Sequence, residues 1–392
     1  MVEVHSRALG PRRLVVGVAA IVSGGIGSYV LGLSAALASS GWEIHLLVTN
    51  EKGNLFDEAR RGLIVHDISH LPLSAEKVRR ATSMVNSIAP EILLLNHCPL
   101  LHYGLPLLTS RIRPIAVVHS DDRRYYVTAT VFRKWIFRWV VPTSKLARRL
   151  PDYIDSSQRD RIRLIPHGVD MQRYARPRLL DQEKSVITFV GFVETNKGAD
   201  LLPAILAIVA AAVPSVVLNI VGDGPLRVQL EDDFRRRGLL DRCVFMGQRR
   251  REDVASILMQ SDLLIHPTRI EGFGLTIIEA MAAAAVPVVT CLDGVTDDII
   301  EHGVHGVLVE LNDIEGFAKN IIDLLLDSAT RIRMARAATE RVERKFSASA
   351  MICGYLEMFD EPDDRGGTEG PVGRFRWTVE ALLERFSARL KT

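Results

Sequence analysis

Short runs of apolar residues, rich in valine, isoleucine and leucine, alternate along this chain with segments of helical length. Parallel strands buried on both faces have this composition, and helices usually form the crossovers between them. One series of runs occupies residues 14–18, 44–48, 63–68, 92–95, 115–118, 139–141 and 162–165, and a second occupies 186–190, 216–221, 243–246, 263–266, 286–290 and 307–309. The alternation predicts an α/β chain of two Rossmann-like domains, each a doubly wound parallel sheet. Ligands bind beyond the carboxyl ends of such strands, so we expect the two domains to face each other across a cleft.

The segment between the two series is rich in proline, glycine and charge, which is typical of a hinge. We expect an N-terminal domain at 1–166, a hinge at 167–184, a second domain at 185–345, and C-terminal helices at 346–392 with a polar, flexible linker at 360–373. The length of 392 residues agrees with two domains. Expected helices include 28–39, 74–88, 101–111, 125–137, 314–327, 329–345, 348–359 and an amphipathic helix at 374–391. Packing on the first domain and contact with a membrane surface both stay open for the last one.

Charge and cysteine content exclude several classes of protein. The 49 Lys and Arg against 47 Asp and Glu give a net charge of +2, which disfavours nucleic acid as a partner. Cys98, Cys243, Cys291 and Cys353 form no CxxC pair, so neither a zinc site nor a disulfide framework is expected, and a cytoplasmic location fits best. The apolar run at 201–213 is shorter than the roughly 20 residues that cross a bilayer.

A glycine-rich turn joins the first predicted strand to the first predicted helix. Gly24, Gly25 and Gly27 would let a phosphate approach backbone N–H groups at the helix start, although such turns are also often purely structural. A dinucleotide enzyme would carry an acidic residue at the end of its second strand to hold the ribose, and none is convincing here. An NAD-dependent enzyme is therefore disfavoured.

The most specific stretch is Pro-Thr-Arg-Ile-Glu-Gly-Phe-Gly-Leu-Thr-Ile-Ile-Glu-Ala-Met-Ala at 267–282, which follows a predicted strand and opens a helix. Glycines free its backbone, and the N–H groups of Leu275 and Thr276 at the helix start are suited to a diphosphate. Glu271 lies at the mouth of this loop. Glu279 lies one turn into the helix, where a carboxylate can accept two hydroxyl hydrogen bonds, as from a ribose.

This stretch closely resembles the Glu-x7-Glu signature of retaining glycosyltransferases of the GT-B fold, especially glycosyltransferase family 4. The segments 24–27, 41–44, 165–170 and 222–225 occupy the order that the family has, and the resemblance covers roughly residues 13–358. It implies a hexosyltransferase that moves a sugar from a UDP- or GDP-sugar to a hydroxyl of a glycan or lipid-linked acceptor, in cell-surface polysaccharide or glycolipid synthesis. No other cofactor is implied. The C-terminal domain would hold the donor and the N-terminal domain the acceptor.

The resemblance also implies residue roles. Lys197 would pair with the diphosphate, Glu271 would face the sugar ring, and His119, directly after the strand at 115–118, would bond a sugar hydroxyl or orient the acceptor. The implied donor contacts are Gly24, Gly25, Gly27, Lys197, Gly222, Gly224, Phe273, Gly274, Leu275, Thr276 and Glu279. Further candidates are Asp121, Arg269 and Gln248, the last in a loop that would lie beside the nucleotide base.

One residue departs from the family pattern. Phe192 follows Gly191 where the family commonly has an arginine, so one diphosphate cation is missing, and Arg269 is the candidate to replace it. Two alternatives to an active transferase stay open: a nucleotide-sugar binding module or inactive transferase partner, and a sugar phosphorylase or epimerase of the same fold. No Asp-x-Asp motif follows a strand, so we expect metal-independent chemistry that EDTA leaves unchanged.

A basic segment at 123–149 carries eight Lys or Arg, no acid and several aromatic residues. A basic aromatic helix would rest on anionic lipid, which favours peripheral contact with the inner face of the cytoplasmic membrane. The alternative is that its aromatic side chains belong to the core, because Trp139 lies in a predicted buried strand.

Overall fold

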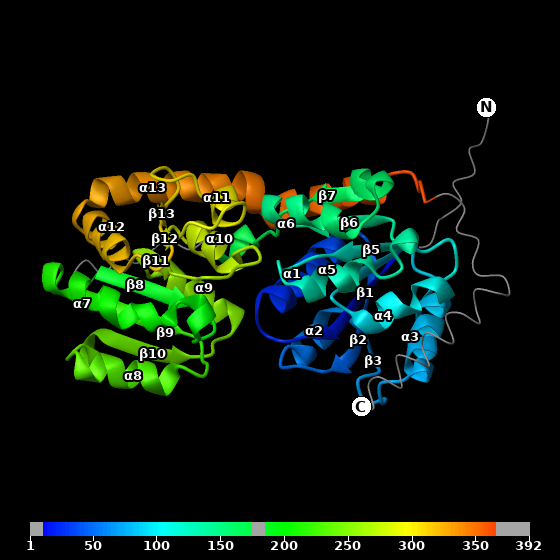
Figure 1. Cartoon of the computed structure of the whole chain (residues 1–392), viewed down its shortest axis with the longest axis horizontal. Helices are drawn as coiled ribbons and strands as arrows, with labels where there is room; N and C mark the ends of the chain where they lie inside the picture. The colour runs from blue at the N-terminus through cyan, green and yellow to red at the C-terminus, as the bar shows by residue number, and fades with distance from the viewer. Residues whose placement is uncertain (1–10, 175–184, 366–392) are drawn as a thin grey trace. The chain divides into compact units, whose positions relative to one another are not determined.

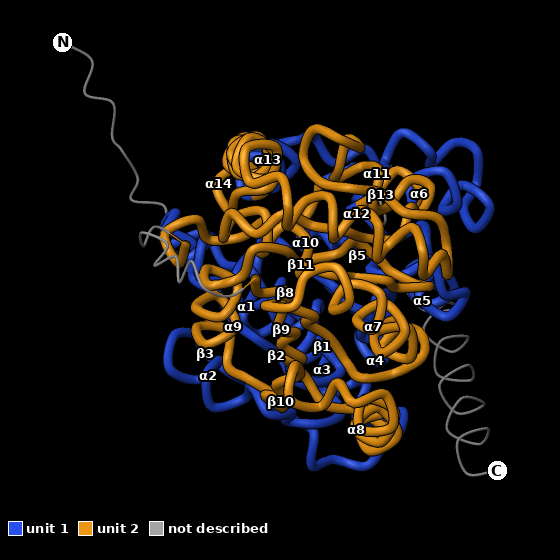
Figure 2. The backbone as a smooth tube through the Cα atoms, turned by 90° about the vertical axis from the view of Figure 1, so that its left-hand side faces the viewer, with its two compact units in different colours: residues 1–142, 146–165, 352–392 blue, residues 143–145, 166–351 orange. Residues whose placement is uncertain are grey.

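The computed structural model describes residues 11–174 and 185–365 (Figure 1). The chain divides into two units, formed by residues 1–142, 146–165 and 352–392 and by residues 143–145 and 166–351 (Figure 2). The predicted hinge lies partly outside the described residues, and the predicted helix at 374–391 lies wholly outside them. The residues from 352 onward belong to the first unit.

The first unit contains one parallel sheet. Its strands are β1 (Arg13–Ala20), β2 (Glu43–Glu51), β3 (Ile64–Asp67), β4 (Ile92–Asn96), β5 (Arg113–Val117), β6 (Arg138–Val141) and β7 (Ile162–Leu164). They lie in the order β3-β2-β1-β4-β5-β6-β7. The strand order reverses between β1 and β4, and such a reversal is where doubly wound sheets bind ligands.

The second unit repeats this arrangement. Its strands are β8 (Ser185–Val190), β9 (Val216–Val221), β10 (Cys243–Gly247), β11 (Leu263–His266), β12 (Val286–Thr290) and β13 (Val307–Val309), in the order β10-β9-β8-β11-β12-β13. All strand pairs are parallel, and the order reverses between β8 and β11. The predicted strands of both domains are thus confirmed, and the fold is that of two Rossmann-like sheets.

Helices cover the sheets. In the first unit they are α1 (Gly25–Ser39), α2 (Phe56–Gly62), α3 (Ala75–Ile88), α4 (Pro99–Gly104), α5 (Arg123–Thr130) and α6 (Ser144–Arg149), whose first two residues count with the second unit. The second unit adds α7 (Leu202–Ala212), α8 (Arg227–Arg236), α9 (Arg251–Met259), α10 (Leu275–Ala282), α11 (Thr296–Ile299), α12 (Ile314–Leu326), α13 (Ser328–Arg341) and the start of α14 (Ala348–Phe359).

Two helices are shorter than the sequence predicted. The predicted helix at 101–111 ends at Gly104 and continues only as a 3-10 turn around Pro106, a residue that cannot donate a helical hydrogen bond. The predicted helix at 125–137 ends at Thr130, because Phe132 adopts a left-handed backbone with φ 53°. The basic segment is therefore not one amphipathic helix. Its Tyr126, Phe137 and Trp139 are buried, so much of its aromatic content belongs to the core.

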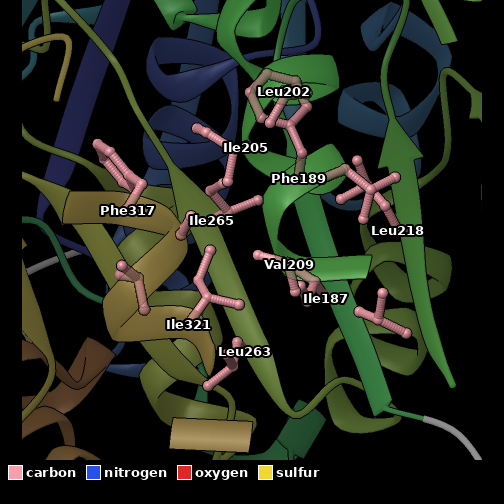
Figure 3. Close-up of a cluster of buried hydrophobic side chains, with 14 of the residues drawn as sticks. Ile187, Phe189, Leu202, Ile205, Val209, Leu218, Leu263, Ile265, Phe317 and Ile321 are labelled. Atoms are coloured by element: carbon pink, nitrogen blue, oxygen red, sulfur yellow. The ribbon is translucent and has the colours of Figure 1, made fainter. Parts of the chain in front are cut away.

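The core of the second unit fixes the two strands that meet at its reversal point. Apolar side chains from β8, β9 and β11 pack against α7 and α12 (Figure 3). The residues of this layer that the figure labels are Ile187, Phe189, Leu202, Ile205, Val209, Leu218, Leu263, Ile265, Phe317 and Ile321. Because β8 and β11 are buried and hydrogen-bonded to each other, the loops that follow them start from fixed positions.

The described part of the predicted linker, residues 360–365, differs from the expected flexible segment. Glu361 accepts hydrogen bonds from Arg138 Nε at 2.5 Å and from Arg163 Nε at 2.6 Å, and Asp364 binds Arg138 Nη1 at 2.8 Å. The side chain of Arg138 is only 4% exposed. This part of the chain is anchored to the first unit because it neutralises a buried arginine.

Candidate functional site

The candidate site of the second unit lies where its strand order reverses. The loop after β8 carries Lys197, in a 3-10 turn at Thr195–Lys197, and the loop after β11 carries Glu271. Lys197 Nζ donates a hydrogen bond to Glu271 Oε2 at 2.8 Å. The structure therefore brings together Lys197 and Glu271, two of the three residues, with His119, for which the resemblance implies catalytic roles.

Glu271 is held in its ionised form by its neighbours. Burial raises the pKa of this carboxyl group, but the hydrogen bond with His266 and the charge of Lys197 together hold the pKa well below its ordinary value. His266 Nε2 lies 3.1 Å from the same oxygen that Lys197 contacts, and Glu271 Oε1 accepts the N–H of Gly272. A carboxylate fixed in this way can accept hydrogen bonds from ligand hydroxyl groups.

The start of α10 follows directly. Gly274 precedes the helix with φ 105°, a left-handed conformation that favours glycine, and no side chain caps the helix. The first backbone bond of the helix runs from Ile277 N–H to the carbonyl of Gly274, so Leu275 and Thr276 precede it with N–H groups outside the helical pattern. Phe273 is buried against His167, with ring centroids 4.9 Å apart, so only its backbone can serve a ligand.

Glu279, one turn into α10, is partly buried and has a perturbed pKa. Burial raises the pKa of Glu279 to about 7, although the charges of Arg251 and Arg173 oppose the shift. The carboxyl group is therefore close to the balance between its neutral and ionised forms at neutral pH. A ribose with two hydroxyl groups would find an acceptor here.

Glu279 should make the stability of the protein fall as pH rises. Its pKa in the folded protein, about 7, exceeds its ordinary value of 4.5, so the folded form binds more protons between these values. The favourable contribution is complete below pH 4.5 and is lost as pH rises through 7, by on the order of 3 kcal/mol. We expect Glu279→Gln to flatten the decrease in thermal midpoint between pH 5 and pH 8. Glu315→Gln, at an exposed position of α12, is the control. An unchanged decrease of the thermal midpoint with pH in Glu279→Gln would contradict the assignment.

Gly222 and Gly224, which the resemblance implies as donor contacts, lie where a larger side chain would not fit. A Cβ on Gly222 would lie 1.9 Å from the carbonyl oxygen of Gly191, and one on Gly224 would lie 2.5 Å from that of Val193. The loops after β8 and β9 therefore touch backbone to backbone. Phe192 lies in the first of these loops with 55% of its surface exposed, so no core packing accounts for it. Gln248 is exposed in the loop after β10.

Arg269, the candidate to replace the missing phosphate cation, is paired with other groups of its own unit. Its guanidinium binds both carboxylate oxygens of Asp200, at 2.7 and 2.9 Å, and also the carbonyl of Thr195. Its backbone N–H and the hydroxyl of Thr268 both bond the carbonyl of Asn196. In this structure Arg269 thus joins the loop of Lys197 to the loop of Glu271, and its predicted role toward a phosphate stays a prediction.

We expect Arg269→Ala to weaken nucleotide-sugar affinity about tenfold without unfolding the protein. The ion pair is partly exposed, so its contribution to stability is at most ~1 kcal/mol. Without it, the distance between Lys197 and Glu271 is no longer fixed by a contact between their loops. Arg269→Lys should recover little, because an ammonium cannot make the two-pronged contact with Asp200. Calorimetric titration measures both, with Arg236→Ala on α8 as the control. Unchanged affinity in Arg269→Ala would show that the ion pair of Arg269 with Asp200 is not needed for nucleotide-sugar binding.

Other predicted site residues belong to the first unit. Gly24 precedes α1 with φ 135°, Gly25 begins the helix, and a Cβ on Gly27 would lie 2.0 Å from the carbonyl oxygen of Val22. His119 is 7% exposed, and its Nε2 lies 2.9 Å from Asn96 Oδ1. Asp121 accepts a hydrogen bond from Tyr126 at 2.9 Å. Their predicted roles toward a ligand stay predictions.

Sequence reasoning missed two residues that shape the site of the second unit. His266 was assigned only to a strand, and Asp200 was not singled out. A polar residue that ends an otherwise apolar buried strand, as His266 does just before Pro267, is a signal that could have identified it. No such signal marks Asp200, because its partner lies 69 residues away.

Within residues 11–174 and 185–365, no three His, Cys, Asp or Glu side chains gather in a way that could hold a metal ion. No helix in the same described parts is long and apolar enough to cross a membrane. Metal-independent chemistry and peripheral membrane contact both stay predictions.

Two Rossmann-like parallel sheets in tandem are the fold of the GT-B glycosyltransferases. HepE from Anabaena, solved with UDP and glucose, superimposes with a TM-score of 0.75 at 17% identity, covering 88% of this chain and 98% of that one, a likeness that establishes the fold. The model for glycosyl transferases group 1 matches residues 170–341, and that for glycosyltransferase family 4 matches residues 23–173. The chain belongs to the family 4, group 1 glycosyltransferases.

Characterised relatives match parts of the chain. N-acetyl-alpha-D-glucosaminyl L-malate synthase from Bacillus anthracis is 30% identical over 189 residues, which is 48% of this chain and 48% of that protein. Phosphatidyl-myo-inositol mannosyltransferase from Mycolicibacterium smegmatis is 31% identical over 209 residues, 52% of each chain. Each match therefore spans about half the length of the relative.

Proposed function

We propose that the protein is a retaining hexosyltransferase that moves a sugar from a nucleotide-diphosphate sugar to a hydroxyl acceptor. The observation that carries the proposal is the Lys197–Glu271 pair beside the uncapped start of α10, at the reversal point of the second sheet. Neighbour HepE was solved with UDP and glucose, which supports a UDP-sugar, while a GDP-sugar is the other candidate donor. Of the two named relatives, the phosphatidyl-myo-inositol mannosyltransferase supports an acceptor in glycolipid synthesis.

The second unit holds the donor in this proposal. The N–H groups of Leu275 and Thr276 and the ammonium of Lys197 bind the diphosphate, since a helix start and a lysine both favour negative charge. Glu279 accepts the ribose hydroxyl groups, and the ionised Glu271 accepts hydrogen bonds from the sugar hydroxyl groups. Lys197 then serves two anions, because its Nζ already contacts Glu271 before any donor binds.

In the reaction, the bond between the anomeric carbon and the phosphate oxygen breaks. A bond from the acceptor oxygen to the same carbon forms on the same face, so the anomeric configuration is retained. The acceptor proton passes to the departing phosphate oxygen, and the nucleoside diphosphate leaves. Lys197 and the α10 amides stabilise the charge that develops on this leaving group, which is the largest contribution expected from a preorganised site. The step needs no protein base and no metal.

Nucleotide sugars should raise the thermal midpoint of the protein by mass action. The test is a panel of UDP-, GDP- and ADP-sugars without metal, on the intact chain and on Lys197→Ala. We expect one nucleotide class to raise the midpoint of the intact protein by several degrees and the variant to lose most of the increase. No increase with any nucleotide sugar would contradict the proposed donor site.

Phe192 favours a second candidate, a nucleotide-sugar binding protein without transferase activity. The ring replaces the arginine that the family commonly has, and its exposure leaves one diphosphate cation unreplaced. The two candidates differ in donor hydrolysis: an active transferase should release free sugar slowly without acceptor, and Glu271→Ala should abolish this release. Binding without any hydrolysis would favour the second candidate.

A further inference from the structure

The first unit has a reversal point of its own, between β1 and β4, with polar residues at the end of β4. Asn96 is the last residue of β4 and pairs in register with Val18 of β1, and His97 follows it. On the β1 side of this point the chain continues into the Gly24 turn and α1. Doubly wound sheets bind ligands at such points, so unpaired polar groups there are candidates for ligand contacts.

Asn96 is such a buried polar group. The residue is 2% exposed, and one side of its amide lies 2.9 Å from His119 Nε2 on the neighbouring strand end. The other side, Nδ2, is buried and has no hydrogen-bond partner among the described residues. Leaving a buried amide donor unpaired is unfavourable, so such a group is retained where something else completes its hydrogen bonds.

His97, the next residue in the chain, carries a second unpaired atom. Its backbone is left-handed, with φ 45°, and its imidazole stacks on Tyr125 of α5 with ring centroids 4.0 Å apart. Its Nδ1 is buried and, like Asn96 Nδ2, without a partner in the described part of the chain. Burial and then the charge of Arg124 lower the pKa of His97, so the ring is neutral at neutral pH. An unprotonated nitrogen of a neutral imidazole can accept a hydrogen bond from a hydroxyl group.

We propose that Asn96 and His97 bind hydroxyl groups of a polyhydroxylated acceptor, a sugar or a cyclitol, at the β1–β4 reversal point of the first unit. A hydroxyl group both donates and accepts: Asn96 Nδ2 donates to a hydroxyl oxygen, and a hydroxyl donates to His97 Nδ1. The assignment rests on the proposed transferase function. It makes both residues determinants of which acceptor is used, while Lys197 and Glu271 act on the donor.

The test removes the imidazole without disturbing the backbone. Asparagine tolerates the left-handed region, so His97→Asn keeps the turn between β4 and α4, and His97→Gly is the second variant. Ala89→Asn is the matched control, because Ala89 is also left-handed, with φ 49°, at the end of α3. Saturation-transfer NMR titrations use methyl α-D-glucopyranoside, methyl α-D-mannopyranoside and myo-inositol as probes. The same samples are then tested for the nucleotide-dependent thermal shift.

We expect the intact protein and Ala89→Asn to bind at least one probe, and both His97 variants to bind it about tenfold more weakly with an unchanged nucleotide shift. Equal affinity in the intact protein and the His97 variants, or no binding of any probe by the intact protein, would overturn the assignment. A missing nucleotide shift in the intact protein would instead show failure of the proposed donor site.

Discussion

Replacing Lys197 by methionine should lower the rate of sugar transfer about 100- to 1,000-fold. The substitution removes the positive charge beside Glu271 and beside the expected diphosphate, and loss of one preorganised group that stabilises developing charge has an effect of this size. The methylene groups of the side chain remain, so local packing is largely kept. Steady-state assays with a saturating acceptor measure the effect, and the decrease should appear in kcat as well as in donor affinity.

Lys319→Met is the matched control, because Lys319 is an exposed lysine of the same unit on α12. Its transfer rate should equal that of the unchanged protein. Transfer by Lys197→Met at more than a tenth of the normal rate would show that the ammonium is not part of the catalytic machinery. A loss of transfer accompanied by unfolding of the second unit would be detected by circular dichroism and would not count as support.

Removing the carboxylate of Glu361 should destabilise the first unit by about 3–5 kcal/mol. Glu361 contacts Arg138 and Arg163, and breaking a buried ion pair leaves a charge without its partner. Asp364 still contacts Arg138, so the lower end of this range is expected. Urea unfolding of Glu361→Ala, followed by fluorescence, measures the change. Glu357→Ala on the exposed side of α14 is the control, and a change below about 1 kcal/mol in Glu361→Ala would contradict the anchoring role.

The same carboxylate should contribute to acid sensitivity. Burial raises the pKa of Glu361, but the hydrogen bonds and charges of Arg163 and Arg138 together lower it by more. The pKa of Glu361 in the folded protein therefore lies below its ordinary value. The stabilising contribution is therefore present above the ordinary value of 4.5 and is lost as pH falls through the lower folded pKa. Glu361→Gln should lose less stability than the unchanged protein between pH 5 and pH 3.

The strands could be predicted well because parallel strands buried on both faces leave apolar runs in the sequence. For β9, β11, β12 and β13 even the predicted ends are those of the structure. The end of α4 has a local cause in Pro106, whereas the end of α5 could not be predicted, because the segment after it depends on distant contacts. After α5, for example, the N–H of Phe137 bonds the carbonyl of Pro114 on β5, and Trp139 Nε1 bonds the carbonyl of Ala129.

In the candidate site, too, local features could be predicted and distant contacts could not. The Glu-x7-Glu spacing and the loop glycines led to Glu271, Gly274 and Glu279, because those residues are close in sequence. The ion pair of Arg269 with Asp200 could not be predicted, because no local pattern connects the two residues. Likewise, the anchoring of residues 360–365 depends on Arg138, more than 200 residues earlier in the chain. Sequence patterns therefore predicted which loops carry the candidate site residues but not how their charges pair.

The most direct measurement is a crystal structure of the protein with the nucleotide that gives the largest thermal shift. The account predicts that the diphosphate lies at the start of α10, within hydrogen-bond distance of Lys197 Nζ and the N–H groups of Leu275 and Thr276, with the ribose on Glu279. A nucleotide bound elsewhere, with the bond from Lys197 to Glu271 unchanged and no ligand at α10, would contradict it.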